Sequence, residues 1–374
     1  MLTLVVAFLV AAIINLLMVR FAFLHENLTG DLLHGPQKVH TGIVPRIGGV
    51  GILCGMLAAS GALMFQPGAD KPKMIFILLA VTLPAFAAGL AEDVLKCAPA
   101  WTRLLGALVS ASLGVLFLGA VIHRLGVPGL DQLLEFWPMA LGLTLFAVAG
   151  MAHAVNIIDG FNGLAGGVAL LILLAFSYVA FKVHDLATFH ICLASAGAIL
   201  GFLIWNYPAG LIFLGDGGAY LIGVLIAETA VLLVVRNPQV SPWFPMLVII
   251  YPVFETVYSI YRRAFVRRKS PGVPDALHLH SLIYRRLLSW MLSSSLGARY
   301  LIQRNAMTTL YLWGLTSLCV IPAVIFYNRT YFLIGFVVVF ACFYAWLYTC
   351  IVRFRTPVWL RRLSHQSSSE SLNE

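Results

Sequence analysis

The residue of this sequence that most clearly suggests chemistry is an aspartate followed by two glycines. Asp216 lies in the stretch FLGDGGAY, and the chain then runs directly into the apolar stretch LIGVLIAETAVLLVV. A carboxylate at the mouth of a membrane-length segment costs free energy unless another group pairs with it. The position of Asp216 therefore predicts a polar site at the membrane boundary.

Polar groups interrupt the apolar sequence in four further places. They are Lys38, His40 and Arg46 in KVHTGIVPRIGG, Glu92 and Asp93 in GLAEDVLK, His153, Asn156, Asp159 and Asn162 in HAVNIIDGFNGLAGG, and His278 and His280 in PDALHLHSL. Magnesium usually takes one or two protein carboxylates and completes its shell with waters and phosphate oxygens. Cationic side chains and glycine-rich turns bind phosphate. The set predicts a site for a hard cation and a phosphorylated ligand.

Each of these groups also has a purely structural interpretation. The aspartates beside glycines could cap helices, the acidic pair in GLAEDVLK could be interfacial, and the basic residues of the first loop could serve membrane topology alone. His278 and His280 could share a metal only in an extended loop, because a helix would place them about 200° apart. No GxxxxGK[ST] motif occurs, which excludes a P-loop nucleotidase.

The elements that must position these groups are membrane helices. Of 374 residues, 61% are hydrophobic and only 10% are charged, whereas roughly a quarter are charged in an ordinary soluble domain. Continuous apolar runs near the length that spans a bilayer favour helices over a β-barrel. We therefore expect an all-α polytopic membrane protein with about eleven transmembrane helices. The runs are 2–24, 47–66, 74–92, 101–120, 137–157, 164–182, 187–207, 211–235, 243–264, 307–327 and 331–352.

The basic residues predict the orientation of these helices. Arg20 lies at the far end of the first apolar run, which places the N-terminus outside and, after eleven spans, the C-terminus in the cytoplasm. Of the 24 Lys and Arg residues, 18 then lie in cytoplasmic segments. All five polar segments fall on the same face. The net charge of +9 thus fits loops beside anionic lipid head groups and does not indicate nucleic-acid binding.

The chain shows no internal repeat and is expected to form one transmembrane domain over residues 1–355. Cytoplasmic loops at 25–46, 92–100, 157–163, 207–216 and 265–306 would carry the site. The composition of residues 364–374 predicts a disordered tail. Six scattered cysteines without a CxxC pair indicate packing rather than disulfides or a zinc site.

The ordered series KVHTGIVPRIGG, GLAEDVLK, NIIDGFNGLAGG, FLGDGGAYLIG and PDALHLHSL resembles the polyprenyl-phosphate N-acetylhexosamine-1-phosphate transferases of glycosyltransferase family 4. The resemblance covers about residues 1–355. It implies transfer of a sugar-1-phosphate, most simply N-acetylglucosamine-1-phosphate, from a UDP-sugar to undecaprenyl phosphate. The products would be UMP and a lipid-linked pyrophosphoryl sugar that starts a surface polysaccharide of the O-antigen kind.

By the same resemblance, Asp216 would ligate Mg²⁺, for which Mn²⁺ is an alternative. Asp93, with Glu92 beside it, would position or deprotonate the lipid phosphate. The substrate-binding residues would be Lys38, His40, Asn156, Asp159, Asn162, His278 and His280. The expected partners are undecaprenyl phosphate, a UDP-N-acetylhexosamine and the bilayer, with homodimerisation left open. The expected location is the bacterial cytoplasmic membrane, with the site facing the cytoplasm.

The sequence departs from the family pattern at three places. Glu92 replaces the first of two usual aspartates, Asn162 replaces the second aspartate of a DGxDG turn, and Ala276 and Ser281 replace an arginine and a histidine of the histidine loop. These changes bear on the sugar more than on the reaction, and they favour the polysaccharide-initiating branch over the pentapeptide-transferase branch. Two other functions stay open, a transporter or flippase for a phosphorylated substrate and a membrane metal-dependent phosphatase.

Overall fold

The apolar runs of the sequence become helices in the computed structural model, which describes residues 1–30, 44–65, 70–266, 277–288 and 298–353. The long helices are α1 (Leu2–Arg20), α4 (Asp70–Leu95), α5 (Ala100–Leu118), α7 (Trp137–Ile158), α8 (Leu164–Lys182), α9 (Leu186–Asn206), α10 (Gly215–Arg236), α15 (Ala298–Ile325) and α16 (Thr330–Arg353). Shorter elements are η1 (Ala22–Leu24), α2 (Glu26–Thr29), α3 (Gly48–Leu63), α6 (Leu130–Leu134), α11 (Trp243–Val248), α12 (Ile250–Tyr261), η2 (Arg262–Val266), α13 (Leu279–Leu282) and η3 (Ile283–Leu287).

The predicted all-α polytopic class is confirmed. Within the described ranges, nine helices are long and apolar enough to cross a membrane, and α3 is a shorter apolar helix of 16 residues. These ranges contain no β-strand, only an isolated bridge between Gly30 and Pro45. Ten of the eleven predicted spans therefore each correspond to a single helix.

The remaining predicted span, 243–264, is wrong as one continuous helix. The chain forms α11, breaks at Ile249 and resumes as α12. Pro252 lies in the first turn of α12 and has no N–H to donate to the carbonyl of Val248 one turn earlier. Hydropathy does not register this loss, because proline leaves the run apolar.

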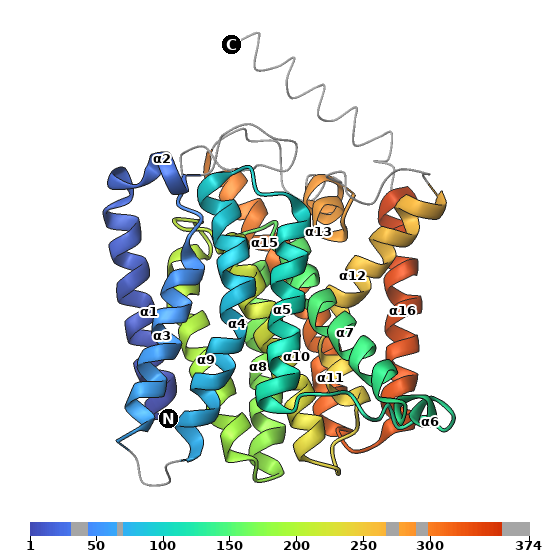
Figure 1. The fold of residues 1–374 in the computed structure, drawn as a ribbon. Coiled ribbons are helices and arrows are strands. Elements are labelled where there is room, and N and C mark those ends of the chain that lie inside the picture. Colours follow the sequence, from blue (N-terminus) through green and yellow to red (C-terminus); the bar gives the residue numbers. More distant parts are fainter. Residues whose placement is uncertain (31–43, 66–69, 267–276, 289–297, 354–374) are drawn as a thin grey trace.

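Helix α10 is the centre of the bundle. It packs against α4, α7, α3 and α8, and its side chains are buried over almost its whole length. Figure 1 shows α1 beginning at one end of the bundle, while α2 and α13 lie at the other end. The polar residues described below gather at the end of α2 and α13. That this end faces the cytoplasm stays a prediction.

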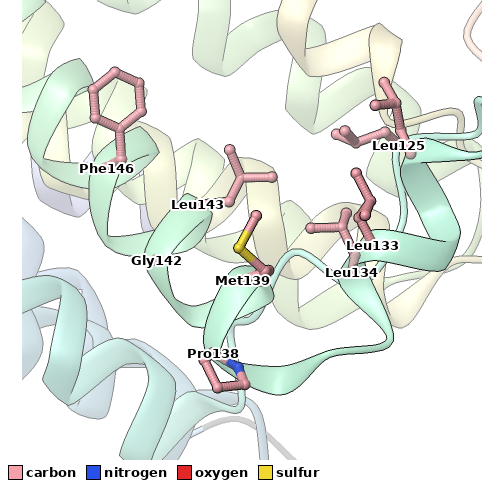
Figure 2. Close-up of a pocket in the computed structure, with 9 residues that line it drawn as sticks. Leu125, Leu133, Leu134, Pro138, Met139, Gly142, Leu143 and Phe146 are labelled. Atoms are coloured by element: carbon pink, nitrogen blue, oxygen red, sulfur yellow. The ribbon is translucent and has the colours of Figure 1, made fainter.

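Two apolar cavities lie away from these polar residues. One of about 420 Å³ lies between α6 and α7 and is lined by residues such as Leu134, Met139 and Phe146 (Figure 2). Another of about 500 Å³ lies among α7, α10 and α11, where Met151, Val231 and Met246 line it. Their linings are mainly hydrocarbon, so the chemistry must be sought elsewhere.

Candidate active site

The segment that leads into α10 is held by backbone contacts to the first turn of α3. The N–H of Gly48 donates to the carbonyl of Phe213 at 2.9 Å, and the N–H of Gly49 donates to that of Leu214 at 3.0 Å. Gly215 then adopts φ +78°, a left-handed conformation that favours glycine. A β-carbon there would lie 2.6 Å from Oδ2 of Asp93. The glycine therefore lets the strained turn into α10 pass directly beside that carboxylate.

We expect Gly215→Ala to destabilise the protein by about 1–3 kcal/mol, because a non-glycine residue is strained at this φ, and to lower activity by displacing Asp216. The thermal unfolding midpoint and the initial rate of the purified protein measure both effects. Gly142→Ala is the matched control, because Gly142 lies within α7 with no atom near its would-be β-carbon. A Gly215→Ala protein with unchanged stability and rate would contradict this role.

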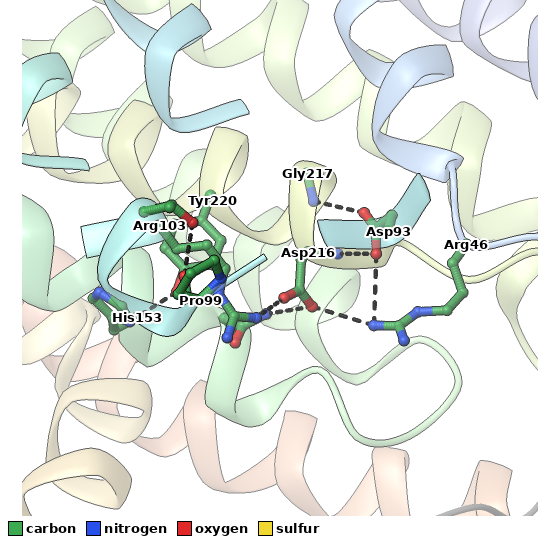
Figure 3. Close-up of polar contacts among 10 residues, drawn as sticks. Arg46, Asp93, Pro99, Arg103, His153, Asp216, Gly217 and Tyr220 are labelled. Carbon is green, nitrogen blue, oxygen red and sulfur yellow. Dashed lines mark hydrogen bonds and ion pairs between the residues drawn. The ribbon is translucent and has the colours of Figure 1, made fainter. Parts of the chain in front are cut away.

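Asp216 is surrounded by two arginines and an amide (Figure 3). Its Oδ1 accepts from Nη2 of Arg46 at 3.2 Å and from Nδ2 of Asn156 at 3.1 Å, and its Oδ2 accepts from Nη1 of Arg103. The Asp216 side chain is only 10% exposed. The partner that this carboxylate requires is thus supplied by α5, α7 and the segment before α3.

Asp93 is more deeply buried and caps the start of α10. Its Oδ1 accepts the N–H of Asp216 at 2.9 Å, its Oδ2 accepts the N–H of Gly217 at 2.8 Å, and Nη2 of Arg46 lies 3.6 Å from Oδ1. A carboxylate is favoured at this position because the first N–H groups of a helix lack partners and the helix dipole is positive there. Asp93 therefore fixes the backbone of Asp216.

Glu92 and Asp93 interact with different helices. Successive helix residues point about 100° apart, and Asp93 faces α10 while Glu92 interacts electrostatically with Arg103 of α5. Oε2 of Glu92 is buried and has no hydrogen-bond partner in the described part of the chain. The predicted role of Glu92 beside Asp93 at the lipid phosphate stays a prediction.

One turn further from the mouth of the site, Tyr220 of α10 meets His153 of α7. The Tyr220 hydroxyl lies 2.8 Å from Nδ1 of His153, and the two rings pack edge to face with centroids 5.1 Å apart. Figure 3 places this pair beside Arg103. The polar cluster thus extends along the facing surfaces of α7 and α10.

The turn that follows α7 carries two predicted residues, Asp159 and Asn162, at the same end of the bundle. Burial, opposed by Arg46 and reinforced by Asp216 and Asp93, raises the pKa of Asp159 to about 7, so Asp159 lies within electrostatic range of the cluster. Asn162 instead donates through Nδ2 to the carbonyl of Pro208 at 3.0 Å. Asn162 thus ties two loops together, and its substrate contact stays a prediction.

His278 and His280 belong to the histidine loop, which packs against the turn that follows α7. Their rings stack with centroids 5.2 Å apart, because His278 is extended and only His280 is helical. A β-carbon on Gly160 would lie 3.1 Å from Nε2 of His280. Burial, reinforced by His278, lowers the pKa of His280 to about 3, so His280 is neutral near pH 7. The histidine loop therefore packs directly on the turn that carries Asp159.

Two predicted residues, Lys38 and His40, lie outside the described residues, as does the predicted tail 364–374. Among the residues that are described, no three His, Cys, Asp or Glu side chains gather closely enough to hold a metal ion by themselves. Any cation bound at Asp216 would therefore need ligands from water or substrate.

Two residues of this region are not among the predicted site residues. Arg103 is one of the basic residues that predict topology, and its guanidinium contacts Asp216. Glu255 lies inside the predicted span 243–264, and it bonds to His278. A signal existed for Glu255, since an ionisable residue inside a predicted span is expensive and usually has a specific partner. For Arg103 the sequence offers no comparable signal among many basic residues.

The fold and site together define a polytopic all-α membrane protein with a carboxylate–arginine–amide cluster at one end of the bundle. The family model described as glycosyl transferase family 4 matches residues 75–234, which include Asp93, Asn156 and Asp216. The chain belongs to this family.

Similar proteins include two named as N-acetylglucosaminyl 1-phosphate transferases. A probable undecaprenyl-phosphate N-acetylglucosaminyl 1-phosphate transferase of Bacillus subtilis is 28% identical over 69% of this chain and 69% of its own length. An undecaprenyl-phosphate alpha-N-acetylglucosaminyl 1-phosphate transferase of Thermotoga maritima is 28% identical over 68% of this chain and 72% of its own. A phospho-N-acetylmuramoyl-pentapeptide-transferase of Rubrobacter xylanophilus is 31% identical over 59% of this chain and 70% of its own.

Proposed function

We propose that this protein transfers N-acetylglucosamine-1-phosphate from a UDP-sugar to undecaprenyl phosphate and so starts a surface polysaccharide. The observation that carries the proposal is the convergence of Asp93, Asp216 and Asn156 with Arg46 and Arg103 at one end of the bundle. The names of the similar proteins support the same chemistry. The site would face the cytoplasm of a bacterial cell, where nucleotide sugars are made.

In this reaction an oxygen of the lipid phosphate attacks the β-phosphorus of the UDP-sugar. The bond from that phosphorus to the oxygen bridging the two phosphates breaks, and UMP leaves with the bond electrons. Arg46 and Arg103 carry fixed positive charge beside Asp216 and would bind phosphate oxygens of the substrates. Holding both substrates in line supplies a large part of the rate.

The donor set at Asp216 fits a magnesium ion. Magnesium needs only one or two protein carboxylates, and the Asp216 carboxylate lies at the mouth of the site with Asp93 directly behind it. Asp216 would hold the ion, with Mn²⁺ as an alternative, and Asp93 would keep Asp216 in place. When bound, the ion would neutralise charge on the diphosphate. A cation there would replace at least one arginine contact of Asp216, which would free that guanidinium for substrate phosphate.

The turn after α7 and the histidine loop would enclose the UDP-sugar. Asn156 and Asp159 would line the nucleotide-sugar pocket, and His278 and His280 would contact its phosphates or sugar. Asn162 would act through the turn that it holds, while Lys38 and His40 would meet phosphate from the first loop. Glu92 would interact with Arg103 rather than with the acceptor.

A panel of UDP-N-acetylhexosamines labelled in the sugar tests the proposal. Membranes containing the full-length protein receive undecaprenyl phosphate and Mg²⁺, and label is followed into the lipid phase. We expect label from UDP-N-acetylglucosamine in lipid, together with UMP in water. Free phosphate from the lipid without sugar transfer would instead indicate a phosphatase, and label that stays in water with every donor would reject the proposal.

Metal removal should abolish the reaction, since the two arginines alone do not offset the charge of a diphosphate and a lipid phosphate together. We expect an excess of chelator to reduce lipid labelling to background, and added Mg²⁺ or Mn²⁺ to restore it. The measurement is the initial rate against free metal concentration. Undiminished labelling in excess chelator would show that Asp216 works without a metal.

A further inference from the structure

A buried carboxylate on α12 is hydrogen-bonded to the histidine loop at His278 and Leu279. Glu255 is 2% exposed, and its Oε1 accepts from Nδ1 of His278 at 2.9 Å and from the N–H of Leu279 at 3.2 Å. Its Oε2 accepts from the hydroxyl of Tyr344 on α16. Both oxygens therefore receive hydrogen bonds, which is the condition under which a buried carboxylate is stable in its ionised form.

These bonds determine which nitrogen of His278 is available. An ionised carboxylate only accepts hydrogen bonds, so Nδ1 of His278 carries a proton. One face of the ring lies against His280, with an interplanar angle of 11°. The ring is fixed in position and tautomer, and Nε2 is the nitrogen left for another group.

The fixed ring is linked to the proposed site through the side chains that pack against it. His280 packs between His278 and the turn after α7, where it also meets Phe161 edge to face at 5.4 Å. That turn carries Asp159 and follows directly from the Asn156 that bonds to Asp216. Glu255 is thus connected to the cluster at α10 through a short series of packed side chains.

We infer that Glu255 is a positioning residue, which sets the orientation and tautomer of His278 so that Nε2 meets a phosphate oxygen of the substrate. The inference rests on the proposed function and adds to it a role for two helices outside the charged cluster. Tyr344 supports Glu255, so α16 contributes to the site although it supplies no group to the reaction. Carboxylates that orient a histidine in this way commonly affect activity strongly without touching the substrate.

A double-mutant cycle tests this inference in the full-length protein with UDP-N-acetylglucosamine and undecaprenyl phosphate. We expect Glu255→Gln and His278→Gln each to lower kcat by about tenfold or more, with KM for either substrate changed less than about twofold. In the His278→Gln background, Glu255→Gln should cause no further loss, because it acts only through that ring. Glu228→Gln is the matched control, since Glu228 is a fully buried glutamate in α10 about three turns beyond Asp216.

Additive losses in the double variant, or wild-type kcat in Glu255→Gln, would overturn the inference while leaving the proposed function intact. Absence of transfer by the wild-type protein would instead reject the proposed function. A second measurement, by NMR spectroscopy, does not depend on enzymatic activity. Nitrogen NMR of isotope-labelled histidine, assigned with His278→Gln, should show Nδ1 of His278 protonated in the wild type and its resonance shifted in Glu255→Gln. An unprotonated Nδ1, or an unshifted resonance, would also overturn the inference.

Discussion

We expect Asp216→Asn to lower the rate of sugar-phosphate transfer at least about a hundredfold, the loss typical of removing one strong electrostatic contact from an active site. The substitution keeps the shape of the side chain but removes the charge that faces Arg46, Arg103 and the proposed cation. Weaker metal binding is the expected cause, so the apparent affinity for Mg²⁺ should fall together with the maximal rate. Both follow from initial rates measured over a range of metal concentrations.

The control for this prediction lies on the same helix. Glu228 is fully buried in α10 about three turns beyond Asp216, and neither of its carboxylate oxygens has a hydrogen-bond partner in the described residues. Glu228→Gln removes one carboxyl group from α10 and should leave the rate unchanged. Wild-type activity in Asp216→Asn would show that the Asp216 carboxylate is not needed for the reaction.

Asp93→Asn should also abolish transfer, but for a different reason. The carboxylate holds the backbone N–H groups of Asp216 and Gly217, and an amide offers only one acceptor oxygen for the two. We expect a rate loss of about a hundredfold or more, with affinity for the UDP-sugar changed less than about threefold, since Asn156 and Asp159 remain. Titration calorimetry with the donor, beside the rate assay, separates binding from transfer.

Asp185→Asn provides a matched control for the capping role of Asp93. Asp185 is also a buried aspartate at a helix start, where it accepts the N–H of Thr188 at 3.2 Å. Each Asp→Asn change leaves one acceptor oxygen in place of two, so buried donors such as Nδ2 of Asn237 beside Asp185 lose their partner, at a cost of about 1–3 kcal/mol. Both variants should therefore be destabilised, while only Asp93→Asn loses activity. Equal activity losses in the two variants would mean that Asp93 contributes only to the stability of the fold.

The helices were predictable because a bilayer allows few structures. Membrane-length apolar runs must bond their backbone internally, so hydropathy alone located the spans. The break at Ile249 escaped prediction because it depends on one missing N–H, that of Pro252, and not on polarity. The position of α10 at the centre of the bundle depends on packing among helices, which no single stretch of sequence specifies.

The site was predictable where polar groups are rare. Asp216, Asp93 and Asn156 stood out against apolar sequence, and the structure brings them together. Arg103 did not stand out, because a basic residue at the end of a span is ordinary and only the fold shows which of them turns inward. Residues 92–95, predicted as the start of a loop, form the end of α4, and this helical form gives Glu92 and Asp93 different directions.

The position of one labelled phosphorus atom tests the central claim most directly. The protein in membranes receives undecaprenyl phosphate, Mg²⁺ and UDP-N-acetylglucosamine labelled in its β-phosphorus. The proposed reaction carries that atom into the lipid phase and releases unlabelled UMP in equal amount. Label that stays in water as UDP while sugar enters the lipid would mean transfer of the sugar alone, and would contradict attack at the β-phosphorus.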